Sequence, residues 1–194
     1  EPNDVRLNES IKIVEGTLAG GNADFDPIIV EEIKEADNYV PEPGKFYFPY
    51  ISKFVHGPYA EPNNTGENWP VFRFADALLL MAENLVQQGK NDQALPYINM
   101  VRDRAGLSDL DAVTLEDVLN ERRHELAFEN HRWTDLLRTG KAIAVMSDYG
   151  VRMKHEHSFL PANSFNITEN RLIYPIPYRD LQLNKNLKQN PGYQ

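Results

Sequence analysis

A glutamate and a histidine stand three residues apart at Glu121 and His124, a spacing at which one helix can supply two metal ligands. A di-iron site needs a second Glu-x-x-His pair, and the sequence contains none. A zinc-protease motif that begins at His124 fails, because Phe128 takes the place of its second histidine. His155 and His157 form a weaker candidate in a loop. A charged, solvent-facing helix surface accounts for the pattern, so we expect neither a metal nor another cofactor.

Paired carboxylates are the second chemistry to consider, because glycosidases use two of them. The chain has 29 acidic residues, so pairs arise easily. Only Glu125 and Glu129 stand in apolar surroundings, and Arg122 nearby favours their ionised form, which works against a general acid. Serine and histidine show no nucleophile-elbow pattern. The sequence therefore predicts a protein that is not an enzyme.

Aromatic residues in or beside loops are the third candidates. Tyr50, Tyr59 and Trp69 occupy such positions. A flat ring can cover the apolar face of a sugar while neighbouring polar groups bind its hydroxyls. Phe48 and Phe54 lie among these aromatics, so some rings of this region must belong to a core. We take Tyr50, Tyr59 and Trp69 as candidate ligand-binding residues.

Charged residues also fall on a helix face that is otherwise apolar. Arg122 and Glu129 share this face with Leu126, and Glu125 lies at its edge. An unpaired buried charge is very unfavourable, so Arg122 is expected to pair with Glu125 or Glu129, three and seven residues away. We interpret Arg122, Glu125 and Glu129 as a structural ion network.

The composition limits the classes of partner. The chain has 194 residues, a net charge of −9 and no cysteine, so it lacks the basic surface that nucleic acid requires and has no thiolate ligands. The apolar run at residues 77–82 is too short to span a bilayer. No signal peptide begins at Glu1, so we expect a mature or shortened fragment, and any membrane anchor would lie upstream of it.

The charged helix face belongs to the stretch from Thr114 to Gly140. Thr114 and Asp117 have capping-box spacing, and Gly140 can end a helix in the left-handed conformation. One helix from Thr114 to Gly140 is expected.

Two further helices precede it, from about Pro70 to Gly89 and from about residue 92 to residue 105. Ala82 and Ala94 lie twelve residues apart, as do the small residues at which the two helices of a tetratricopeptide repeat approach closely. One repeat cannot bury its own face. Other repeats, or the helix that begins at Thr114, must cover it.

The sequence thus predicts a mainly α protein, with a tetratricopeptide-like helix pair, further helices, and extended or irregular segments at both ends. We expect an irregular, strand- and loop-rich lead-in at 1–69, the helix pair at 70–107, and a helical and loop-rich part of the same domain at 108–194. Shorter elements are expected as strands at 11–14 and 46–54, a strand or helix at 28–36, a helix at 141–146 ending near 148–150, and an extended run at 171–177.

Three segments resemble the SusD/RagB family. The hallmark E-R-R-x-E-L-x-F-E-x-x-R-W-x-D-L-x-R-T-G runs from Glu121 to Gly140. The stretch from Arg73 to Glu83, RFADALLLMAE, is similar to the family's R-Y/F-A-D/E-x-L-L-M-x-A-E, although Asn84 stands where alanine is frequent. P-I-P begins at Pro175, and L-x-L-N-x-N-L-x-Q-N-P-G-Y closes the chain.

The resemblance implies a surface lipoprotein of the bacterial outer membrane that binds an oligosaccharide or other nutrient. It implies a TonB-dependent outer-membrane transporter as partner, and further helical units upstream. It assigns no contact residue in this chain. The alternative is a helical-repeat protein-interaction module with no glycan site in this fragment.

Overall fold

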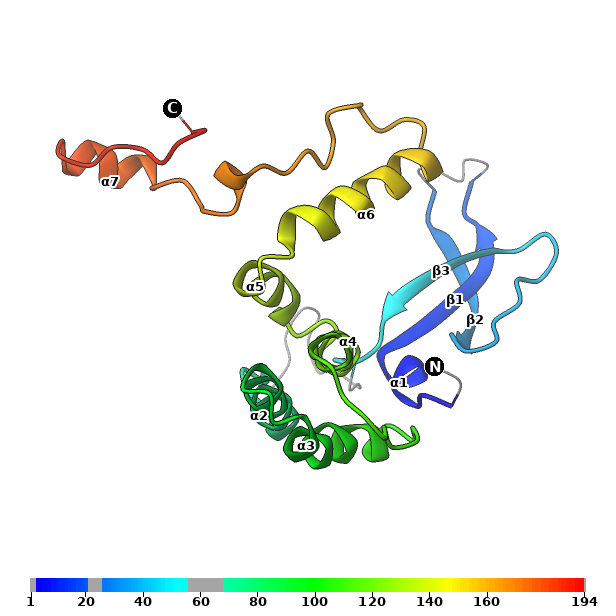
Figure 1. The fold of residues 1–194 in the computed structure, drawn as a ribbon. Helices are drawn as coiled ribbons and strands as arrows, with labels where there is room; N and C mark the ends of the chain where they lie inside the picture. The colour runs from blue at the N-terminus through cyan, green and yellow to red at the C-terminus, as the bar shows by residue number, and fades with distance from the viewer. Residues whose placement is uncertain (1–2, 21–25, 56–67, 194) are drawn as a thin grey trace. The chain divides into compact units, whose positions relative to one another are not determined.

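A computed structural model describes residues 3–20, 26–55 and 68–193 of the chain. Within these residues the structure is mostly helical, with a small antiparallel sheet near the N-terminus, as predicted (Figure 1). The chain divides into two compact units, residues 1–130 and 131–194. The division into a lead-in at 1–69, a helix pair at 70–107 and a C-terminal part at 108–194 stays a prediction. In chain order, the first unit contains α1 (Arg6–Ser10), β1 (Ile11–Leu18), β2 (Ile28–Glu35), β3 (Phe46–Ile51), α2 (Phe74–Gln87), α3 (Asn91–Arg104) and α4 (Leu115–Glu125).

The sheet has β1 at its centre, with β2 and β3 antiparallel on either side. Val14 of β1 lies opposite Ile33 of β2 and Phe48 of β3. The segment at 28–36, which sequence patterns left undecided, is therefore a strand. The register shifts between Glu15 and Gly16. A Cβ atom on Gly16 would lie 1.9 Å from the Ile29 carbonyl oxygen, so only glycine fits this close approach.

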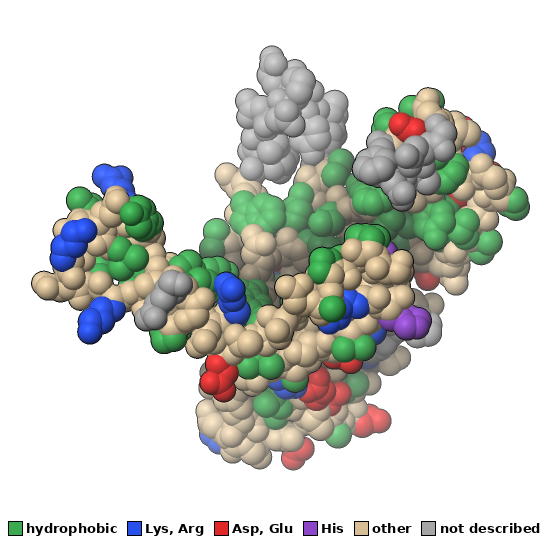
Figure 2. Space-filling model, turned by 90° about the horizontal axis from the view of Figure 1, so that it is seen from above, with side chains coloured by type: hydrophobic (Ala, Val, Ile, Leu, Met, Phe, Trp, Pro, Cys, Tyr) green, Lys and Arg blue, Asp and Glu red, His purple; other side chains and the backbone are tan. Residues whose placement is uncertain are grey.

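One face of the sheet is apolar and open to solvent in this chain. Ile33 and Phe48 are both 62% exposed, although they flank Val14 in the register. Figure 2 shows hydrophobic side chains at the surface on the side that it presents.

The helical core forms where α2, α3 and α4 meet, as the apolar periodicity predicts. Leu79, Ala82, Ala94 and Ile98 are fully buried there. The two alanines allow α2 and α3 to approach closely, and α4 contacts α2, so the helix after Thr114 covers the pair. The predicted capping box at its start is present, with the Asp117 amide donating to Thr114 Oγ1 over 3.3 Å and the Thr114 amide donating to Asp117 Oδ2 over 2.8 Å.

The single helix expected from Thr114 to Gly140 is wrong, because α4 ends at Glu125 and α5 (His131–Arg138) begins after a turn. Phe128 and Asn130 have φ values of 68° and 65°, which a continuous helix cannot contain. The two compact units meet in sequence at this turn. Gly140, with φ of 68°, does follow the end of α5 as predicted.

The second unit contains α5, α6 (Ala142–Glu156), the short 3-10 helix η1 (Glu169–Arg171) and α7 (Tyr178–Leu183). The end expected near 148–150 is wrong, because α6 continues through Gly150 to Glu156. Gly150 is buried against Phe165, and a Cβ atom there would lie 2.5 Å from the Phe165 Cβ atom. The extended run expected at 171–177 is not a strand: η1 ends at Arg171, residues 172–173 form a bend, and residues 174–177 have no regular secondary structure. Instead the Gln189 side chain donates to the Ile176 carbonyl over 2.9 Å and accepts from the Ile176 amide over 2.8 Å.

Candidate functional site

A pocket of about 1030 Å³ opens in the first unit, between the N-terminal segment, the sheet and the residues that lead into α2. The sheet contributes one lining residue from each of its three strands, Lys12, Ile33 and Tyr50. The rest of the wall comes from α1, the segment after β3, residues 68–73, Arg104 at the end of α3, and Glu125 and Glu129. Of the three aromatic residues proposed from sequence, Tyr50 and Trp69 both line this pocket. Tyr59 lies outside the described residues.

The aromatic part of the wall is a stacked pair. The ring centroids of Phe54 and Trp69 are 4.4 Å apart, with an angle of 34° between the planes. Trp69 is 50% exposed, so its ring remains accessible while Phe54 supports it. Phe54, which sequence analysis weighed only as a possible core residue, is thus a member of the pocket. A supported, half-exposed indole is a suitable surface for the apolar face of a sugar.

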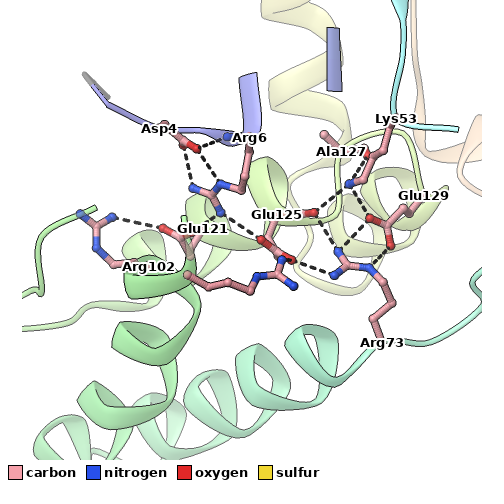
Figure 3. Close-up of polar contacts among 10 residues, drawn as sticks. Asp4, Arg6, Lys53, Arg73, Arg102, Glu121, Glu125, Ala127 and Glu129 are labelled. Carbon is pink, nitrogen blue, oxygen red and sulfur yellow. Dashed lines mark hydrogen bonds and ion pairs between the residues drawn. The ribbon is translucent and has the colours of Figure 1, made fainter. Parts of the chain in front are cut away.

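The floor of the pocket is an ion network centred on Glu125 (Figure 3). The Glu125 side chain is fully buried and accepts hydrogen bonds from three arginines. Arg73 Nη1 lies 2.9 Å from Oε1, Arg6 Nη1 lies 3.2 Å from Oε2, and Arg104 donates to Oε1. A buried carboxylate is tolerated only when it is paired in this way.

Glu129 forms the second centre of the network. Arg73 holds its carboxylate at two points, through Nε at 2.7 Å and Nη2 at 2.8 Å, and Lys53 Nζ lies 2.5 Å away. Burial raises the pKa of the Glu129 carboxyl, but the hydrogen bonds from Arg73 and Lys53 outweigh it, and the net pKa is lowered. The Lys53 ammonium also donates to the carbonyls of Glu125 and Ala127, so it stabilises the turn after α4 (Figure 3).

Arg6 extends the network to the N-terminal segment. Its guanidinium donates to Asp4 through Nη2 at 2.7 Å and to Glu121 Oε1 at 2.6 Å. Burial lowers the pKa of Arg6, but the hydrogen bonds to Asp4 and Glu121 raise it overall, so the group stays charged. Glu121 also accepts from Arg102 at 3.2 Å. Glu121, considered above as a metal ligand beside His124, is therefore engaged by two arginines.

The pairing expected for Arg122 is wrong. Its Nη1 donates to Asp76 Oδ1 on α2 over 2.7 Å, and both side chains are buried. Glu125 and Glu129 are held by Arg73 instead. Periodicity compares residues along one helix, whereas these partners come from 46 to 56 residues away. The sequence signal that could have found them is the pair of charges, Arg73 and Asp76, at the start of the apolar helix α2.

A separate acidic group lies on the sheet, away from this network. Ligand oxygens of Glu15, Glu32 and Glu42 lie within 4.8 Å of one another. The Lys34 ammonium lies 2.5 Å from both Glu15 and Glu42, so a lysine occupies the position that a cation would take. Hydrogen bonds from Lys34 and then from Tyr39 lower the pKa of Glu15 to about 2. This group is an ion cluster beside the sheet in which Lys34 pairs with the three glutamates.

The fold combines a tetratricopeptide-like helix pair with a small sheet, and it carries an aromatic pocket and ion-paired charges. These features are typical of a binding protein. The SusD family matches residues 2–193, and the chain belongs to that family. The predicted SusD/RagB resemblance is confirmed. SusD-family proteins are non-catalytic binding proteins, in agreement with the expectation that the chain is not an enzyme. Among the described residues no helix has the length and apolarity needed to cross a membrane.

Several curated proteins are similar in sequence. SusD-like protein P38 of Formosa agariphila is 35% identical over 156 residues, which are 74% of this chain and 28% of that protein. Starch-binding protein SusD of Bacteroides thetaiotaomicron is 31% identical over 125 residues, 64% of this chain and 21% of that protein. The chain thus spans less than a third of the length of these relatives.

Solved structures agree with the fold. A laminarin-binding SusD-like protein has 34% identity and a TM-score of 0.53 over 80% of this chain and 31% of its own. Surface glycan-binding protein A from Bacteroides uniformis aligns with 98% of this chain and 38% of its own, with a TM-score of 0.61. At 23% identity, that second likeness shows the fold alone.

Proposed function

We propose that this chain helps to bind an oligosaccharide in the pocket lined by Tyr50 and Trp69, without catalysis. The whole protein would act as a surface lipoprotein of the bacterial outer membrane and deliver its ligand to a TonB-dependent transporter. The observation that carries the proposal is the convergence of two aromatic residues, 19 positions apart in sequence, on one pocket beside charged groups. The names of the relatives, which include a starch-binding and a laminarin-binding protein, support the same class of ligand.

The geometry suits a sugar for two reasons. The Trp69 ring, backed by Phe54, offers a flat apolar surface to the C–H face of a pyranose ring. Arg73, which also lines the pocket, has five N–H groups, of which four bond Glu125 and Glu129, so one can donate to a hydroxyl oxygen. Its ion pairs with these glutamates hold it in place before a ligand arrives, which reduces the entropy lost on binding.

The alternative is a protein-interaction surface, and exposed apolar side chains in the second unit favour it. Tyr174, Tyr178 and Leu183 are each about three-quarters exposed. A partner such as the transporter could cover them. The two functions are compatible in one full-length protein, but they predict different effects of mutation in this chain.

A glycan panel tests the proposal. Isothermal titration calorimetry of the full chain with maltooligosaccharides and laminarin oligosaccharides should show binding to at least one glycan. Trp69→Ala and Tyr50→Ala should each weaken that binding by about five- to thirtyfold, because an aromatic contact with a ring ligand contributes on the order of 1–2 kcal/mol. Tyr59→Ala extends the test to the third predicted residue.

Tyr178→Ala is the matched control, since it removes an exposed aromatic from the second unit, and should leave the affinity unchanged. If no glycan binds, or if binding survives both Trp69→Ala and Tyr50→Ala, this pocket is not the glycan site. Loss of transporter binding on Tyr178→Ala, with glycan binding absent throughout, would support the protein-interaction alternative.

A further inference from the structure

The charged side chains of the pocket are distributed unequally between its floor and its mouth. The Glu125 and Glu129 side chains are almost completely buried. The Arg104 side chain is 62% exposed, and those of Lys53 and Arg73 are about one-fifth exposed. Of the acids among the described lining residues, Glu9 is the exposed one. A molecule that enters the pocket therefore meets mainly cationic groups.

The number of charges points the same way. Five basic residues line the pocket against three acidic ones, in a chain whose net charge is −9. Asp4 and Glu121 neutralise Arg6 from behind the lining. Lys12 pairs with Glu35 at 2.6 Å, but that glutamate is largely exposed, and an exposed pair is weak. Arg73 pairs with Glu129 as well as Glu125, whereas Arg104 pairs with Glu125, which it shares with Arg6 and Arg73.

Arg104 is the cation best placed to receive an anion. It is the last residue of α3 and lines the pocket. Within the described part of the chain, one guanidinium nitrogen of Arg104 donates to Glu125. A guanidinium carries five N–H donors in a planar fork that matches the oxygens of a carboxylate or sulfate. Arg104 can therefore bind an anionic group while it keeps its bond to Glu125.

We propose that the pocket prefers an acidic oligosaccharide, one whose carboxylate or sulfate ester lies against Arg104 while a sugar ring rests on Trp69. This inference rests on the proposed function, because it names the class of glycan that the same pocket takes. Anion and ring are recognised by different parts of the wall, so their contributions can be separated by experiment. Two classes of glycan carry such an anionic group: uronic acids have a carboxylate, and sulfated sugars have a sulfate ester.

Calorimetry with three oligosaccharides of matched length tests the preference: a galacturonate oligomer, a sulfated galactan oligomer and a neutral laminarin oligomer. We expect at least one acidic oligomer to bind about tenfold more tightly than the neutral one at low salt, the range that a charge-assisted hydrogen-bonded pair supplies. The advantage should shrink as sodium chloride rises from about 20 mM to about 500 mM, because salt screens exposed charges. The stronger of the two acidic ligands identifies the anionic group.

Charge-removing variants locate the effect. Arg104→Gln should reduce acidic binding to the level of the neutral oligomer and leave neutral binding unchanged. Arg123→Gln is the matched control, because Arg123 is exposed on α4 and does not line the pocket. Trp69→Ala should weaken the acidic and neutral ligands together. A thermal melt of each variant by circular dichroism verifies that it is folded.

The two proposals fail in different ways. If acidic and neutral oligomers bind equally, or Arg104→Gln has no effect, the acidic preference is overturned and the glycan site stands. If no oligomer of any charge binds to the chain, both the preference and the proposed glycan site are overturned.

Discussion

Arg73, the residue just before α2, forms a two-point ion pair with Glu129, which lies 56 residues later in the turn between α4 and α5. The same guanidinium also holds Glu125. One arginine therefore joins the start of the first core helix to the end of the third, beside the wall of the candidate pocket. The packing of these helices and the candidate pocket therefore depend on the same ion pairs.

Replacing Arg73 should be strongly destabilising. Arg73→Ala leaves Glu129 with Lys53 alone and removes one of three partners of Glu125, and breaking a buried pair costs about 3–5 kcal/mol. We expect a large fall in the free energy of unfolding measured by urea denaturation. Arg123→Ala, which removes an exposed arginine from α4, should change it by less than about 0.5 kcal/mol. Equal effects of the two substitutions would show that the Arg73 network contributes little.

Arg122 and Asp76 should behave as one unit. Arg122→Ala leaves the Asp76 carboxylate buried without this partner, so we expect a marked fall in melting temperature, with a loss of about 3–5 kcal/mol. Asp76→Ala should have a similar effect. The double substitution should cost clearly less than the sum, because no unpaired charge then remains. Strictly additive values from a double-mutant cycle would contradict the pairing.

Gly16 should tolerate no side chain. Gly16→Ala places a Cβ atom 1.9 Å from the Ile29 carbonyl oxygen, so β1 and β2 must separate at the bulge. We expect a loss of about 1–3 kcal/mol, the range for overpacking, together with faster amide hydrogen exchange in both strands. Thr17→Ser, at the adjacent exposed position, keeps the hydroxyl that hydrogen-bonds Glu31; it is the control and should have little effect. Unchanged exchange in Gly16→Ala would refute the close approach.

The Glu129 network should make stability depend on acid pH. The pKa of Glu129 is lowered from its usual value of 4.5, so its contribution is complete above pH 4.5 and is lost as pH falls through the folded-state pKa. The difference in melting temperature between the native chain and Glu129→Gln should be constant from about pH 7 to about pH 5 and shrink below about pH 4.5. A difference that is independent of pH down to about pH 2 would rule out this linkage.

Local sequence patterns were reliable for the elements that depend on near neighbours. Apolar periodicity located α2 and α3, the Thr114–Asp117 spacing located the capping box, and Gly140 marked the end of α5. The same reasoning failed at the turn between α4 and α5. The helical pattern of the sequence continues there, but the helix itself is interrupted. The carbonyls and carboxylates of that segment are bound by Lys53 and Arg73, which lie far away in the chain.

The sequence by itself therefore determined the mainly helical class, the repeat-like pair and membership of the SusD family, because each is written in residues that are close together or in fixed motifs. Only the tertiary structure decided that Arg122 pairs with Asp76, that Arg73 holds Glu125 and Glu129, and that Tyr50 and Trp69 share a pocket. The reason is physical: burial and ion pairing depend on which distant segments meet, and that is established when the chain folds.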